Sequence, residues 1–229
     1  MEVEFQQFQR VLQEQQDKRE RIIRISREIT IQSKRMIFLL HQASSTEFPL
    51  PLEFDKTKQH KQNIQKQLGL LKQELDTPDA ERYAASCSPG IQEFVEAYAF
   101  EYWLQRQSLI HPKDPKFQTD LQSFDYVLGL CDMTGEIMRF LITHGSKFAM
   151  EDVLSHVQFL RELNLECTKL KNLSRRSQNE LKQKFGVMDS SISKVESICY
   201  SKILRMSDQT SVKRDTENLA SKQKKLRIH

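Results

Sequence analysis

Residues 2 to 43 contain neither glycine nor proline, and their apolar residues recur with a helical period. A run of this length without either helix-breaking residue can fold as one long helix. The apolar positions that share one face of that helix are Phe8, Val11, Ile22, Ile25, Ile29, Met36 and Leu40. We therefore expect one helix over this segment, with a single apolar face.

Helix-breaking residues are also scarce in the rest of the chain. Glycine and proline number 6 each in 229 residues, well below their usual shares of about 7% and about 5%. Turn signals divide the remaining apolar patterns into separate helices. We predict an all-α fold of seven long antiparallel helices: 2–43, 52–75, 77–109, 120–143, 149–163, 165–184 and 189–207. Residues 1–207 would form one helical domain, followed by a basic, disordered tail at 208–229.

The composition limits which binding partners and which cellular compartment we expect for this protein. The net charge of +4 suits a polyanionic partner without requiring one. Long, thin helices leave apolar stripes for other chains, so we expect an oligomer. The four cysteines are widely spaced, and neither a secretory signal nor an apolar run of 18 residues occurs. These features favour a reduced intracellular protein with no membrane segment.

Two predicted helices carry paired carboxylates on largely apolar surfaces. Glu93 and Glu96 lie three apart in the stretch 90–104, and Asp132 and Glu136 lie four apart in 124–142. Buried carboxylates are costly unless they are paired or bound to a metal. If the helices meet, the four side chains could bind Mg²⁺, which prefers oxygen ligands and can activate water near a phosphodiester.

The spacing alone is weak evidence for such a site. Pairs of this kind occur by chance on many helices, and a solvated, ion-paired stripe explains them more simply. Gly129 and Gly135 lie inside the predicted helix 120–143, where each costs about 1 kcal/mol relative to Ala. This cost indicates that another backbone or a ligand approaches the helix closely. Tyr98, Tyr102 and Trp103 could stack on bases, but at helical spacing such aromatics are more often core. The six histidines form no ligand-spaced pair, and no nucleotide-binding or hydrolase motif occurs.

The first predicted helix is basic on the side opposite its apolar face. The residues alone favour a solvated face with local ion pairs, such as Glu20 with Arg24. The alternative is a stripe that contacts RNA phosphates, whose affinity would fall markedly with salt. Its candidate residues are Lys18, Arg19, Arg21, Arg24, Arg27, Lys34 and Arg35.

Several of these segments resemble the translin/Trax family, over residues 5 to 207 and in one order. The most specific match is Asp125–Gly129 followed by Asp132–Arg139. The others are residues 17–21, 26–30, 33–41, 90–97, 194–196 and 199–200. The match is closer to the branch of translin-associated factor X (Trax) than to translin.

The resemblance implies a seven-helix subunit of a hollow hetero-octamer with translin. It also implies a Mg²⁺-dependent endoribonuclease, with Mn²⁺ as an alternative metal, that cleaves single-stranded RNA. Passenger-strand fragments in RNA interference and tRNA precursor fragments are the implied substrates. The family's catalytic, metal-binding carboxylates fall on Glu93, Glu96, Asp132 and Glu136.

One departure concerns the N-terminus. The basic N-terminal extension typical of Trax does not precede the first predicted helix, so we expect a cytoplasmic protein and leave nuclear import open. The alternative to an enzyme is a non-catalytic subunit that binds single-stranded nucleic acid or serves assembly.

Overall fold

The computed structural model describes residues 2–52, 54–117, 122–171 and 174–226. Within them the chain is helical and has no strand, which confirms the predicted all-α class. The long helices are α1 (Glu2–Ser44), α2 (Lys58–Leu75), α3 (Ala84–Arg106), α4 (Ser123–His144), α5 (Met150–Thr168) and α6 (Arg175–Leu226). Short 3₁₀ turns are η1 (Asp55–Thr57), η2 (Ala80–Tyr83), η3 (Pro115–Phe117) and η4 (Gly145–Lys147).

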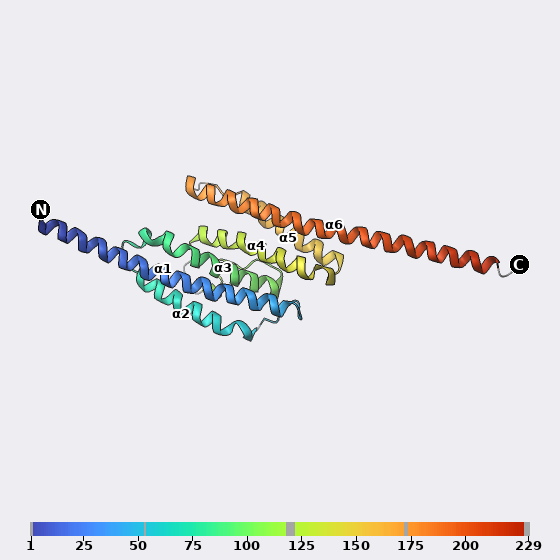
Figure 1. Cartoon of the computed structure of the whole chain (residues 1–229), viewed down its shortest axis with the longest axis horizontal. Helices are drawn as coiled ribbons and strands as arrows, with labels where there is room; N and C mark the ends of the chain where they lie inside the picture. The colour runs from blue at the N-terminus through green and yellow to red at the C-terminus, as the bar shows by residue number, and fades with distance from the viewer. Residues whose placement is uncertain (1, 53, 118–121, 172–173, 227–229) are drawn as a thin grey trace.

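The helices pack side by side in a bundle with α3 at its centre (Figure 1). Helix α1 packs against α2 and α3, and α3 packs against α4. Helix α6 packs against α4 and α5 on the other side. The N-terminal part of α1 and the C-terminal part of α6 extend beyond the bundle at opposite ends (Figure 1). None of the helices in the described ranges has an apolar stretch of membrane-spanning length.

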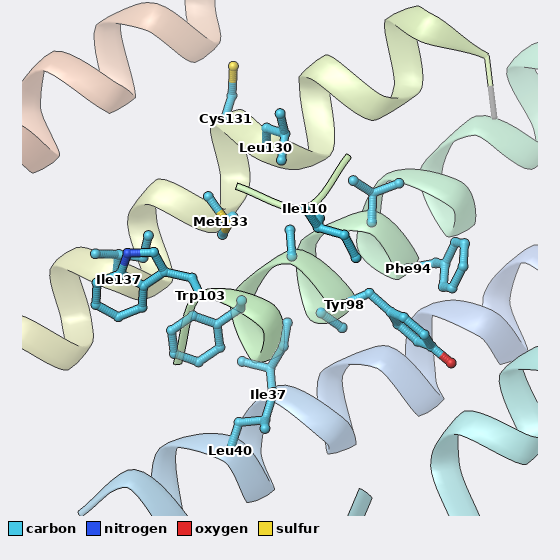
Figure 2. Packing of buried hydrophobic residues seen from close by; sticks show 14 of the residues in the cluster. Ile37, Leu40, Phe94, Tyr98, Trp103, Ile110, Leu130, Cys131, Met133 and Ile137 are labelled. Carbon is cyan, nitrogen blue, oxygen red and sulfur yellow. The ribbon is translucent and has the colours of Figure 1, made fainter. Parts of the chain in front are cut away.

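The core is built around the aromatic side chains of α3. Phe94, Phe100 and Trp103 are fully buried. Figure 2 shows Ile37 and Leu40 of α1 and Ile137 of α4 near Trp103. Tyr98 is also buried, so it and Trp103 belong to the core, as their helical spacing indicates. This packing holds α1, α3 and α4 in a fixed relation to one another.

The prediction of seven helices is wrong, because the described residues form six α-helices. The segments predicted as 165–184 and 189–207 are divided differently: α5 continues to Thr168, and α6 runs without a break from Arg175. Gly186, which lies between the two predicted segments, is inside α6. One glycine costs about 1 kcal/mol in a helix, and burial of Met188 and Ile192 just beyond it favours continuation.

Helix α6 also continues where we predicted a disordered tail. It extends through Leu226, while residues 227–229 lie outside the described part of the chain. No glycine or proline follows Gly186, so the sequence contains no strong helix stop there. The domain boundary at residue 207 stays a prediction.

Helix α3 passes through Pro89, a residue type that usually interrupts or kinks a helix. The Ser26 side chain of α1 supports this turn. Its Oγ donates a hydrogen bond to the Cys87 carbonyl (3.2 Å) and accepts one from the Gly90 N–H (3.0 Å). A Cβ at position 90 would lie 2.6 Å from the Ser26 carbonyl oxygen, so only glycine lets the two backbones come this close.

The two glycines of α4 differ in what surrounds them. A Cβ at Gly129 would lie 2.7 Å from the Gln92 carbonyl oxygen and 2.7 Å from the Val95 Cβ. The prediction of a close backbone approach is therefore confirmed for Gly129. At Gly135 a Cβ would meet no atom of the described residues within 4 Å, so no backbone of this chain approaches closely there, and the approach of a ligand stays a prediction.

Alanine at these two positions is expected to change stability in opposite directions. Gly129→Ala should destabilise the protein by roughly 1 to 3 kcal/mol, because α3 would have to move away. Gly135→Ala should stabilise it by up to about 1 kcal/mol through helix propensity. Urea unfolding followed by circular dichroism measures both. Equal effects of the two substitutions would contradict the close packing of α3 and α4 at Gly129.

Candidate functional site

A cavity of about 540 Å³ opens between α1, α3 and α4, and we call it the acidic pocket. Three carboxylates, several basic groups and one exposed aromatic side chain line it. The lining residues are Lys34, Ile37, Phe38, His41, Gln42, Ser45, Glu93, Glu96, Glu136, Arg139, Thr143 and His144.

The predicted carboxylates reach this pocket from two helices. Glu93 and Glu96 lie on α3, and Glu136 lies on α4. Asp132 lies one turn before Glu136 and does not line the cavity, although it is close enough to Glu96 to affect its ionisation. The packing of α3 on α4 at Gly129 thus brings together the two pairs that the sequence places 36 or more positions apart.

Three of the four carboxylates each pair with a different basic side chain. Lys34 Nζ on α1 lies 2.8 Å from Glu93 Oε1, and this pairing raises the pKa of Lys34. His41 Nε2 lies 2.6 Å from Glu136 Oε2. On the far side, Lys184 Nζ of α6 lies 2.5 Å from Asp132 Oδ1.

Glu96 differs from the other three. Within the described part of the chain, no hydrogen bond or ion pair ends on its carboxylate. Its burial and the nearby charges of Asp132, Glu93 and Glu136 together raise its pKa to about 8, while the charge of Lys34 opposes them. Burial and the neighbouring negative charges thus both disfavour the ionised form of Glu96.

This donor set fits a hard divalent cation in its chemistry. The ligands would be carboxylate oxygens, which Mg²⁺ and Mn²⁺ accept, and the raised pKa of Glu96 indicates that added positive charge would be favourable there. In the ranges described, however, no three acidic, histidine or cysteine side chains are arranged to hold a metal as they stand. Instead, Lys34, His41 and Lys184 each pair with one of the carboxylates.

The structure divides the predicted basic stripe into two groups. Lys18 lies 2.9 Å from Asp79, and Arg21 makes two hydrogen bonds to Glu74, so both are engaged within the subunit. Lys34 lines the acidic pocket, whereas four other members are exposed elsewhere along α1. They are Arg19, Arg24, Arg27 and Arg35.

The sequence did not predict which basic side chains pair with these carboxylates. His41 was one of six unremarkable histidines, and Lys184 lies far along the chain in α6. Lys34 was considered only as an RNA contact. Helical position could have suggested Lys34 and His41, since they lie seven apart on α1 and so share a side of that helix. No local signal indicates Lys184, because only the packing of α6 on α4 brings it to Asp132.

Two solved structures share this fold. "Structure of AfC3PO - duplex RNA complex" matches with a TM-score of 0.71 and 19% identity, covering 90% of this chain and 99% of that chain. "Crystal structure of apo-NeC3PO" matches with a TM-score of 0.67 and 20% identity, covering 86% and 96%. These likenesses show the fold of the subunit.

Sequence comparison reaches further than fold. The Translin-associated protein X homolog of Schizosaccharomyces pombe is 54% identical over 210 residues, which cover 91% of each chain. Translin-associated protein X of Rattus norvegicus is 28% identical over 232 residues, covering 89% of this chain and 79% of that protein. The Translin family matches residues 17–206. The six-helix bundle with its acidic pocket therefore belongs to a member of the translin family.

Proposed function

We propose that this chain is a Mg²⁺-dependent endoribonuclease subunit that works in a hetero-oligomer with translin and cleaves single-stranded RNA. The observation that supports this most directly is the convergence of Glu93, Glu96 and Glu136 at one cavity, with Asp132 beside them. The unpaired, half-buried Glu96 adds weight, because such a group is costly to a fold unless a cation joins it.

Glu93, Glu96, Asp132 and Glu136 would hold the metal. A divalent cation bound there would polarise a phosphodiester of the RNA and activate a water molecule. The hydrogen bond from His41 fixes the Glu136 carboxylate in position. Lys34 and the exposed Arg139 flank the carboxylates and would bind phosphate oxygens of the RNA. We expect products with a 5′-phosphate and a 3′-hydroxyl.

The RNA backbone would approach along α1. We propose Arg19, Arg24, Arg27, Lys34 and Arg35 as phosphate contacts, since they lead to the acidic pocket along an exposed part of the helix. Lys18 and Arg21 already bind carboxylates of the same subunit and would contribute less. The solved AfC3PO complex with duplex RNA supports RNA as the ligand class. Passenger-strand fragments and tRNA precursor fragments are the substrates that we propose.

The test is cleavage of end-labelled single-stranded RNA by the chain co-purified with translin. We expect cleavage with Mg²⁺, none with EDTA, and a fall of about a hundredfold or more for Glu93→Gln with Glu96→Gln. The matched control is Glu162→Gln with Glu166→Gln, two exposed carboxylates on α5 outside the pocket. Cleavage that survives the pocket substitutions would place the chemistry elsewhere.

A second candidate function is a non-catalytic RNA-binding or assembly subunit. The ion pairs of Lys34, His41 and Lys184 favour it, because they already offset most of the pocket's charge. Under this alternative the chain binds single-stranded RNA and assembles with translin, but Mg²⁺ and the pocket substitutions have no effect on cleavage.

A further inference from the structure

Phe38 is the exposed aromatic side chain of the acidic pocket. It lies on α1, lines the cavity, and leaves 67% of its surface open. Leaving a side chain of this size in water forfeits about 1.5 to 3 kcal/mol of burial free energy. Its neighbours on the helix show that this exposure is local, because Ile37 and Leu40 are buried.

The groups around Phe38 are charged rather than apolar. Lys34 lies one turn before it, Arg35 lies three residues before it, and Arg139 reaches the same cavity from α4. Lys34 and Arg139 already pair with Glu93 and Glu136, but both side chains remain largely exposed, so a partner helix that covered Phe38 would still have to desolvate them at a cost. A ligand that combines a flat apolar face with negative charge would satisfy both the ring and the cations.

An unpaired nucleotide has that combination. Bases of single-stranded RNA stack on aromatic rings, whereas bases inside a duplex already stack on one another. We infer that Phe38 is a stacking platform for one unpaired base of the RNA bound at the acidic pocket. This inference rests on the proposed function and deepens it, since it gives a physical reason for a preference for single strands. Tyr98 and Trp103 cannot serve this purpose, because they are buried in the core.

Binding to RNA with and without bases tests the inference. The full chain is titrated in Ca²⁺ buffer into a labelled oligouridylate of twelve residues and into a ribose-phosphate chain of equal length that lacks bases. A gel run after the titration checks that the RNA was not cleaved. We expect wild type to prefer the oligouridylate by about tenfold. Phe38→Leu should lose that preference without weaker binding of the base-free chain, and Phe38→Trp should keep it.

Two controls separate stacking from other roles. Ile31→Ala removes another exposed apolar side chain of α1 outside the pocket and should leave the base preference unchanged. The mass of the hetero-oligomer with translin is also measured for each variant. A base preference that persists in Phe38→Leu overturns the inference. Loss of assembly in Phe38→Ala also overturns it, because Phe38 would then contact a protein partner.

The outcome is distinct from failure of the proposed function. Cleavage by wild type with an unchanged base preference in Phe38→Leu would refute only the stacking role. Base-dependent binding through Phe38 without any Mg²⁺-dependent cleavage would refute the nuclease and leave the stacking role intact.

Discussion

Replacing Glu96 by Gln is expected to stabilise the metal-free protein at pH 8 while removing RNA cleavage. The pKa of Glu96 is raised from an ordinary value near 4.5 to about 8. Between these values the folded state keeps a proton that the unfolded chain has released, so the free energy of unfolding falls as pH rises. Gln mimics the protonated form at every pH. The gain should be about 2 kcal/mol at pH 8, less than the full shift implies because solvent reaches part of the side chain.

Urea unfolding at pH 4.5, 6 and 8 in EDTA measures this effect. Wild type and Glu96→Gln should converge at pH 4.5 and separate as pH rises. Mg²⁺ should stabilise wild type at pH 8 and have a smaller effect on the variant, because binding to the folded state alone raises its stability. Glu162→Gln is the control and should follow wild type. A variant that is less stable than wild type at pH 8 would contradict an uncompensated charge at Glu96.

Replacing Lys61 by Met is expected to destabilise the protein by about 3 kcal/mol. Lys61 Nζ lies 2.6 Å from Glu101 Oε1, and the Glu101 side chain is only 3% exposed. Thr57 donates a further hydrogen bond to the same oxygen (2.9 Å). Removal of the cation leaves a buried carboxylate with one neutral donor, which is costly. Chemical unfolding at pH 7 measures the loss.

The double variant separates loss of the charge pair from loss of packing. Lys61→Met with Glu101→Gln removes both charges and keeps an acceptor for Thr57, so most of the stability should return. Lys72→Met, an exposed lysine later in α2, should change stability by no more than about 0.5 kcal/mol. If the double variant is no more stable than Lys61→Met alone, the ion pair does not carry the effect.

The helices themselves were largely predictable from the sequence. The segment 2–43 lacks helix-breaking residues and has one apolar face, and α1 follows it closely. The prediction failed at the break between residues 184 and 189, where α6 continues. Pro89 and Gly186 both disfavour a helix, but α3 and α6 run through them, with the Ser26 hydrogen bonds beside Pro89 and the buried Met188 just beyond Gly186. Such contacts depend on distant segments, so a local pattern cannot reveal them.

Only the carboxylates of the acidic pocket were predictable from the sequence. The carboxylate pairs stand out because Glu and Asp are unusual on apolar helices, and the structure brings them to one place. The pairing of each carboxylate with its basic partner was not predictable, because the packing of α1 and α6 decides which carboxylate Lys34, His41 and Lys184 each meet. Exposure of Phe38 was equally hidden, since its neighbours Ile37 and Leu40 have similar hydrophobicity and are buried.

The contacts of α1 with the rest of the bundle restrict how this protein can change in length during evolution. Ser26 fixes α1 against α3 at Gly90, and His41 fixes it against α4 at Glu136. One inserted or deleted residue between these two points would turn every later side chain of α1 by about 100°. Lys34 or His41 would then leave the pocket. Insertions and deletions should therefore accumulate in the loop between α1 and α2 and be excluded from residues 26 to 41.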